Sequence, residues 1–289
     1  MRKHYALLFL LATMWSGSFA FIKIGVQSVG PLTLTWARLA IAAVILYIWL
    51  KIKNGRLPSD LQSWGVFAFI GLVGNALPFS LISWGETRID SGLTAILMGV
   101  MPVTTALLAH AFIKDEPFNG RTGLALAIGF CGLMILLGAD ALAGLTGPLL
   151  AQIAVLFSAV CYGASATFTR YFTTQRSGAA TASGTMIAAF AWMTPITLIV
   201  EQPLSQSPTL AGLLAIAYLG IFPTGLAMLI FFYLIAQLGV NRFAQVNYIV
   251  PVLGALWGMV FLGEPFSWKL AIALGLVLLS INIVRSRPT

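Results

Sequence analysis

The chain has 289 residues, of which 59% are apolar and only 8% are charged, and its mean hydropathy is +0.95. So few charged residues could not cover the surface of a soluble protein of this length, which excludes a soluble globular fold. The formal charge of +8 could suggest nucleic-acid binding, but in a membrane protein it is better explained by basic loops on one side of the bilayer.

Long apolar runs predict helices that cross a membrane, because roughly 20 residues of helix span the hydrocarbon core. The first run continues well past the length of a signal-peptide core, so it predicts a retained helix. Short connections rich in Gly, Pro and Asn separate the runs and leave no room for a soluble domain. Both cysteines lie within the runs and are expected to be buried free thiols. In chain order, we predict ten spans at 4–27, 32–51, 64–84, 91–113, 121–139, 148–170, 180–200, 209–237, 242–263 and 267–285.

The basic residues predict how the spans are oriented. An even number of spans places both termini on the same side of the membrane. If the N-terminus lies inside, twelve of the sixteen basic residues fall in cytoplasmic segments and three in outer segments, while Arg38 lies within a span. Because Lys and Arg accumulate in cytoplasmic loops, the sequence predicts that both termini lie in the cytoplasm.

The two halves of the chain resemble each other at a spacing of 147–149 residues. The run from Trp15 to Lys23 aligns with the run from Tyr162 to Arg170. A proline followed by Glu-Pro-Phe also recurs, first as Pro102 and 116–118 and then as Pro251 and 264–266. We therefore predict an all-α membrane protein with two five-helix repeats, residues 4–139 and 148–285. Because each repeat has an odd number of spans, the second is inverted, and such symmetry lets a single central site open to either side.

The run Trp15-Ser-Gly-Ser-Phe19, Arg38 in the second span, Pro102 in the fourth span and the Glu-Pro that follows resemble the EamA-type ten-helix permeases of the drug/metabolite transporter superfamily. Among these, the chain is similar to bacterial exporters of aromatic and neutral amino acids. The resemblance implies secondary active export of small metabolites across the inner membrane of a bacterium. It also implies a cavity lined mainly by spans 1, 3, 4, 6, 8 and 9. Met186 stands at the position equivalent to Arg38, so an arginine role is not duplicated.

Ionisable residues inside a membrane are costly, so their positions are informative. All eight acidic residues fall in loops or at span ends, which argues against a membrane-embedded carboxylate and leaves no central proton carrier. For Arg38, snorkelling or bonding to a neighbouring helix end is favoured over contact with a substrate. For His110, a structural hydrogen bond is favoured over proton coupling. Glu116 and Glu264 each precede a proline, and bonding to exposed backbone groups or a basic side chain is favoured over a role in a gate.

Five prolines fall inside predicted spans, at positions 78, 102, 195, 223 and 251. Proline removes a backbone hydrogen bond and kinks a helix, and the freed carbonyl is tolerated beside a cavity. Pro102 and Pro251 occupy equivalent places in the two repeats. We predict that they act as hinges or shape the cavity, with simple packing as the alternative.

Polar and apolar side chains near these kinks form the predicted substrate site. A zwitterionic amino acid needs donors for its carboxylate, acceptors for its ammonium group and an apolar wall for its side chain. For each residue taken singly, packing or lipid contact is the alternative. The predicted set is Trp15, Ser18, Asn75, Phe79, Ser83, Met98, Met101, Tyr162, Ser165, Thr224, Met228, Asn247, Tyr248 and Trp257.

Other functions remain open at this point. A permease for other metabolites or for hydrophobic drugs is the nearest alternative, followed by a channel or a lipid scramblase. A polar stripe or a charged ring along one helix is typical of a channel, and the predicted spans show neither. Two histidines, two cysteines and no central acid argue against an enzyme, so no catalytic residue, metal or cofactor is expected. The expected partners are a small-molecule substrate and the lipid bilayer, with no nucleic acid, and the chain is expected to be monomeric.

Overall fold

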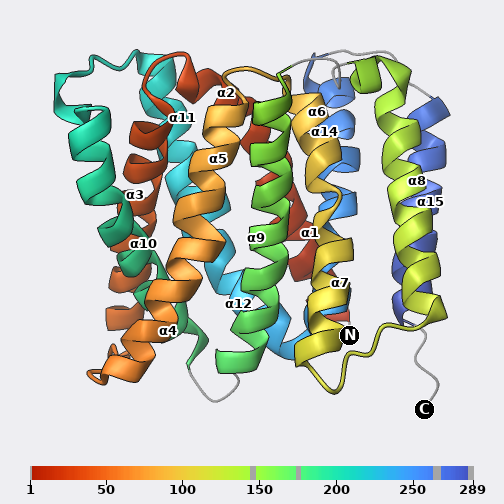
Figure 1. Cartoon of the computed structure of the whole chain (residues 1–289), viewed down its shortest axis with the longest axis horizontal. Coiled ribbons are helices and arrows are strands. Elements are labelled where there is room, and N and C mark those ends of the chain that lie inside the picture. Colours follow the sequence, from red (N-terminus) through yellow and green to blue (C-terminus); the bar gives the residue numbers. More distant parts are fainter. Residues whose placement is uncertain (1, 144–147, 174–176, 263–267, 286–289) are drawn as a thin grey trace.

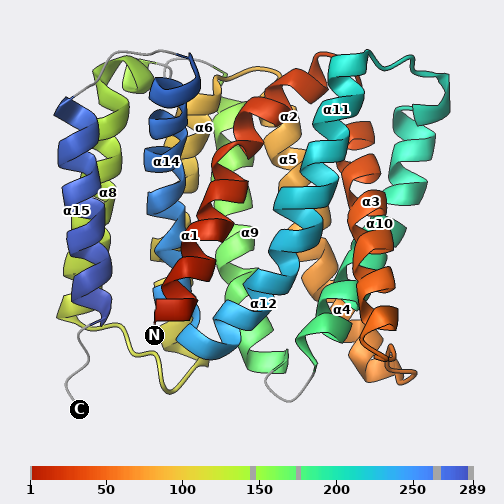
Figure 2. The ribbon, with the colours of Figure 1, turned by 180° about the vertical axis from the view of Figure 1, so that it is seen from behind.

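The computed structural model describes residues 2–143, 148–173, 177–262 and 268–285, and within these ranges every regular element is a helix (Figure 1). The helices lie side by side and are joined at the two ends of the bundle. The start of α1 (Arg2–Ser16) and the end of α15 (Trp268–Arg285) lie at the same end (Figure 2). The protein is therefore an all-helical, multi-pass membrane protein. Six stretches are long and apolar enough to cross a membrane, namely Lys3–Val26, Pro31–Ile52, Leu61–Gly85, Leu149–Phe172, Gly178–Val200 and Leu210–Leu238.

Each predicted apolar range coincides with one helix or with consecutive helices. After α1, the first half contains α2 (Ser18–Val26), α3 (Pro31–Ile52), α4 (Leu61–Gly71), η1 (Leu72–Ala76), α5 (Leu77–Gly85), α6 (Ser91–Met98), α7 (Met101–Phe112) and α8 (Gly120–Ala143). Before α15, the second half contains α9 (Leu149–Thr173), α10 (Gly178–Val200), η3 (Pro203–Ser205), α11 (Leu210–Leu219), η4 (Gly220–Leu226), α12 (Ala227–Leu238), α13 (Val240–Ala244) and α14 (Val246–Leu262).

Two of the long helical stretches contain a π turn, which the sequence analysis did not predict. These turns are η1 and η4, and their first residues are 148 positions apart. Pro223 lies inside η4, while Pro78 follows η1 in the first turn of α5. Because a proline ring cannot fit a regular turn or donate a backbone hydrogen bond, a widened turn is a natural local solution. The indole Nε1 of Trp15 donates to the carbonyl of Pro223 at 3.0 Å, so a side chain from α1 bonds to this turn.

Another helix is broken where a close contact requires glycine. Gly17 separates α1 from α2, and a Cβ atom there would lie 2.8 Å from the hydroxyl oxygen of Tyr218. The ring of Tyr218 stacks on Phe21 with 4.0 Å between centroids. This packing joins α2 to α11 and redirects the chain after the end of α1.

Helices from the two halves pack closely against each other. Helix α3 packs against α10 on one side of the bundle, and α8 packs against α15 on the other (Figures 1 and 2). Between these pairs lie α1, α5, α9, α12 and α14, which surround the apolar core. Of the two cysteines, both free, Cys161 is buried as expected, but Cys131 is exposed because it lies on the outer face of α8.

Carboxylates from one half bind the first backbone N–H groups of helices in the other half. Glu201, after α10, accepts hydrogen bonds from the N–H of Leu32 at 3.0 Å and from the N–H and hydroxyl of Thr33 at 2.8 Å each. These N–H groups have no partner within α3, and the positive end of its dipole favours a negative charge.

Glu116 makes an equivalent contact at α13. Its two carboxylate oxygens accept from the N–H groups of Val240 and Asn241, at 2.7 Å each. Gly239 precedes them with φ of +78°, and a Cβ atom there would collide with Glu116. Glu116 thus bonds to exposed backbone groups, which is the first of the two roles considered for it. Its repeat equivalent, Glu264, lies outside the described residues.

We predict that Glu201→Ala lowers the melting temperature of the purified protein, because three hydrogen-bond donors at the start of α3 lose their anionic partner. The expected loss of unfolding free energy is about 1–3 kcal/mol. Thermal unfolding in detergent measures it, with Arg56→Ala as the control that removes one exposed charge without a hydrogen bond. Equal melting temperatures for Glu201→Ala and the control would contradict the role of Glu201.

Candidate functional site

A central cavity lies where the broken helices meet. The empty space among its lining residues is about 990 Å³, including the part open to solvent. Its lining comes from both halves of the chain. Of the residues singled out from the sequence, the following line it: Trp15, Ser18, Arg38, Asn75, Phe79, Met98, Met101, Tyr162, Ser165, Met228, Asn247 and Pro251.

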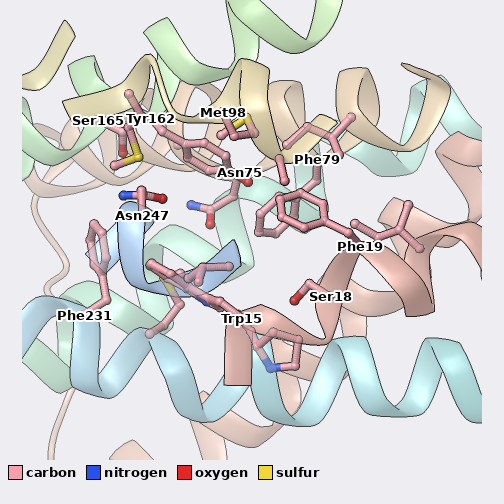
Figure 3. Close-up of a pocket in the computed structure, with 18 of the residues that line it drawn as sticks. Trp15, Ser18, Phe19, Asn75, Phe79, Met98, Tyr162, Ser165, Phe231 and Asn247 are labelled. Carbon is pink, nitrogen blue, oxygen red and sulfur yellow. The ribbon is translucent and has the colours of Figure 1, made fainter. Parts of the chain in front are cut away.

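The cavity wall is largely apolar and aromatic. Phe79 and Tyr162 meet edge to face with 6.1 Å between ring centroids. Figure 3 shows Phe19 beside Phe79, and Phe231 on the side of Asn247. The sequence analysis missed several wall residues, although helical spacing could have indicated them, since they lie within a turn or so of predicted ones. These are Phe19, Ile22, Ile70, Gly74, Ile82, Ala95, Phe231, Phe232 and Val250; Pro223, predicted as the site of a kink, also lines the cavity.

Arg38 is a cavity residue and remains inside the protein. Only 3% of its surface is exposed, and its Nε and Nη2 donate to the hydroxyl of Thr224 at 3.0 and 2.8 Å. The guanidinium carbon lies 4.0 Å from the centre of the Phe79 ring. Of the two structural roles favoured for Arg38, snorkelling is therefore wrong, because the side chain extends across to η4 and bonds to this neighbouring helical segment.

Two other polar atoms of the cavity lining have no partner. The hydroxyl of Ser18 and the amide oxygen Oδ1 of Asn75 are buried and form no hydrogen bond with any residue that the structure describes. A buried polar atom left in this way costs about 1–3 kcal/mol. The amides of Asn75 and Asn247 point into the same space, with Trp15 and Ser18 on the opposite wall (Figure 3). These atoms are therefore free to bind a polar ligand.

The position of Ser165 on the wall depends on a close contact between helices. A Cβ atom on Gly74 would collide with the hydroxyl of Ser165. Glycine at this position lets η1 approach α9, which brings Ser165 to the same cavity as Asn75.

Several predicted residues do not line the cavity. Tyr248 follows Asn247 and so points about 100° away around the helix. It is fully buried, and its hydroxyl donates to the carbonyl of Leu126 at 3.3 Å. Ser83 is buried with its oxygen 3.5 Å from the hydroxyl of Thr35. Thr224 does not line the cavity, but its hydroxyl accepts two hydrogen bonds from the guanidinium group of Arg38.

The remaining predicted residues lie elsewhere or are not described. Pro102 begins α7 beside the lining residue Met101, but it does not itself line the cavity. His110 is exposed, and its Nδ1 accepts from the N–H of Phe118 at 3.1 Å, which ties the end of α7 to the next loop. The side chain of Trp257 lies outside the described part of the structure.

A buried carboxyl group near the cavity was not singled out from the sequence. Glu86 follows Ile82 of the cavity wall by one turn, and its side chain is not exposed. Ser91 donates to its Oε2 at 3.3 Å, and Lys23 donates to its backbone carbonyl at 2.8 Å. Burial raises the pKa of the Glu86 carboxyl to about 8, while the hydrogen bond from Ser91 and the charge of Lys23 oppose this shift.

Helices long enough to span a membrane, arranged around a cavity with both apolar and polar walls, define a membrane transport protein. The chain belongs to the EamA-like transporter family, which matches residues 2–138 and again 149–286. Members of this family are transporters.

Individual relatives of the chain are also described as transporters. The chain is 26% identical to the uncharacterised inner membrane transporter YedA of Escherichia coli K12 over 282 residues, which cover 97% of this chain and 90% of that protein. It is 25% identical to a probable terminal-alkyne amino-acid exporter of Streptantibioticus cattleyicolor over 258 residues, or 89% and 84% of the two chains. A crystal structure with 20% identity and a TM-score of 0.78 covers 97% of this chain and 96% of its own, which shows a shared fold.

The raised pKa of Glu86 predicts how stability depends on pH. Between the ordinary pKa of a carboxyl group and about 8, the folded protein holds a proton on Glu86 that the unfolded chain has lost. Stability therefore falls as the pH rises through this window. Glu86→Gln carries no such group, so it should melt at a higher temperature than the parent at pH 8 and show a shallower decline between about pH 6 and 8.

Melting curves in detergent at a series of pH values measure this difference. Asp90→Asn, which removes an exposed carboxyl nearby, is the control and should follow the parent. Curves for Glu86→Gln that run parallel to the parent at every pH would show that Glu86 is not protonated in the folded protein.

Proposed function

We propose that this protein is a secondary active transporter that exports neutral and aromatic amino acids from the cytoplasm by alternating access. The observation that carries the proposal is the cavity, where an apolar, aromatic wall surrounds the unpaired polar atoms of Ser18 and Asn75. A neutral amino acid matches this cavity, because it joins charged amino and carboxylate groups to an apolar side chain. The wall from Phe79 and Tyr162 suits an aromatic side chain.

The relative in Streptantibioticus cattleyicolor supports the substrate class, since that protein is a probable exporter of an amino acid. The predominance of apolar lining favours a second candidate, the transport of hydrophobic drugs. The two candidate functions differ in the role of the polar atoms, because a hydrophobic drug does not require a hydrogen bond to the Asn75 amide.

Alternating access is supported by how the helices pair. Helix α1 packs against α14 and α12, and its counterpart α9 packs against α7 and α5. Exchanging the halves converts one set of contacts into the other, and the π turns η1 and η4 also correspond. We therefore propose ten spans in two inverted repeats, 4–139 and 148–285, with both termini in the cytoplasm. Pro102 and Pro251 lie at equivalent places beside the cavity, where a hinge would change its opening.

A second cavity supports an access route from one end of the bundle. It is lined by Trp49 of α3, Arg170 of α9 and Tyr233 of α12, among others. Phe232 lines both this cavity and the central one. In the proposed mechanism, Phe232 acts as a gate between the two spaces and its ring moves aside when the route opens.

The test compares transport with stability in a matched pair of variants. Purified protein in liposomes should take up phenylalanine and other neutral amino acids above empty liposomes, with and without a proton gradient. Asn75→Leu keeps the volume but removes the unpaired amide, so it should reduce uptake by about 10-fold or more without loss of melting temperature. Tyr248→Phe, a change outside the cavity, should leave the KM unchanged.

Uptake no greater than in empty liposomes for every amino acid would refute the substrate class. If Asn75→Leu moved amino acids at the parent rate, the cavity would not be the site. Uptake of a hydrophobic cation in place of amino acids would favour the drug-transport candidate.

A further inference from the structure

We infer that Arg38 forms the carboxylate subsite of the central cavity, where its guanidinium group binds the substrate's carboxylate beside the Phe79 ring. This inference rests on the proposed function and deepens it, because it predicts selection for small carboxylates over amines that lack a carboxyl group. It also makes Arg38 a residue that contacts the substrate, whereas the sequence alone favoured a structural role.

The first argument is the unpaired charge. Burying an ionised group is costly unless an opposite charge and hydrogen bonds compensate it. Arg38 is 3% exposed, yet its hydrogen bonds to described residues go to one neutral hydroxyl, that of Thr224. In the part of the chain that the structure describes, no acidic side chain pairs with it. A guanidinium group carries five N–H donors, and Thr224 accepts from two, so donors remain for an anion in the cavity.

The second argument is that the guanidinium group is held in place before any ligand binds. Thr224 donates to the carbonyl of Leu219, five residues earlier, at 2.6 Å. That spacing belongs to the π turn η4, so the widened turn sets the position of the hydroxyl that binds Arg38. The face of the Phe79 ring, 4.0 Å away, supports the other side through a cation–π contact. A fixed, planar fork suits a carboxylate, which it can bind through two parallel hydrogen bonds.

The third argument is the charge of the lining as a whole. Arg38 is the charged residue among those that line the cavity, and no carboxylate lines it in the described structure. A cationic amine would therefore stand near a buried positive charge with nothing to offset it. A zwitterion avoids this cost, since its carboxylate binds Arg38 and the amide oxygen of Asn75 can accept from its ammonium group.

The proposed carboxylate subsite has no counterpart in the second half of the chain. Met186 occupies the position equivalent to Arg38, lies on α10 and is fully buried. Met186 does not line the cavity, so the first half supplies a cation there and the equivalent position of the second half supplies none. A substrate with one carboxylate is expected to bind in a single orientation.

The experiment compares four ligands that share a phenyl ring: phenylalanine, phenylalanine amide, phenethylamine and 3-phenylpropionate. Each is tested as an inhibitor of phenylalanine uptake into proteoliposomes and as a stabiliser in thermal unfolding. The parent protein should bind phenylalanine and 3-phenylpropionate at least about 10-fold better than the amide or the amine. Arg38→Gln should lose most phenylalanine uptake and reduce that preference to about 3-fold or less, with Arg38→Lys intermediate because it keeps the charge but not the fork.

Lys23→Gln is the matched control, since it removes a basic residue that does not line the cavity, and it should keep the parent's preference. The inference is overturned if folded Arg38→Gln prefers carboxylates as strongly as the parent, or if it weakens all four ligands equally. If Arg38→Gln does not fold, thermal unfolding of the parent protein tests the inference instead. Stronger stabilisation of the parent by phenethylamine than by 3-phenylpropionate would then overturn the inference. Stabilisation by carboxylates without amino-acid uptake would refute the proposed function and leave the subsite in place.

Discussion

The hydrocarbon core of a membrane offers no water to satisfy polar groups, and the arrangement around the cavity follows from this constraint. The indole of Trp15 bonds to the carbonyl of Pro223, and Glu201 binds the start of α3. Among the described residues, the hydroxyl of Ser18 and the amide oxygen of Asn75 have no partner and line the cavity, whereas Glu86 Oε1 and Asn241 Oδ1 have none and lie outside it. The two atoms in the cavity lie where a ligand could supply the missing hydrogen bonds.

The architecture was largely readable from the sequence, whereas the orientation of side chains was not. Apolar runs located the helices because membrane helices must be long and apolar. Kinks at prolines indicated where the cavity lies, but a kink does not determine which face points inward. Asn247 and Tyr248 were predicted together, and only Asn247 lines the cavity, because consecutive residues diverge around a helix.

Of the two structural roles expected for Arg38, snorkelling was wrong for a related reason. A basic residue two turns from a span end can snorkel, and the sequence does not reveal an alternative partner in the other half of the chain. That partner, Thr224, is 186 residues away and is positioned by a π turn. The π turns η1 and η4 thus begin 148 residues apart in the two halves, whereas Met186 stands where a second arginine would be expected from the same spacing.

The central claim is that a single cavity is reached alternately from the two sides of the membrane. It is tested by placing one cysteine at Met98, a cavity residue, in a chain whose Cys131 and Cys161 are replaced by serine or alanine. A thiol reagent that cannot cross the membrane is then added to right-side-out and to inside-out vesicles. The account predicts labelling of position 98 from both sides, with protection by substrate in each case. Labelling from one side alone, under every condition of substrate and gradient, would contradict it.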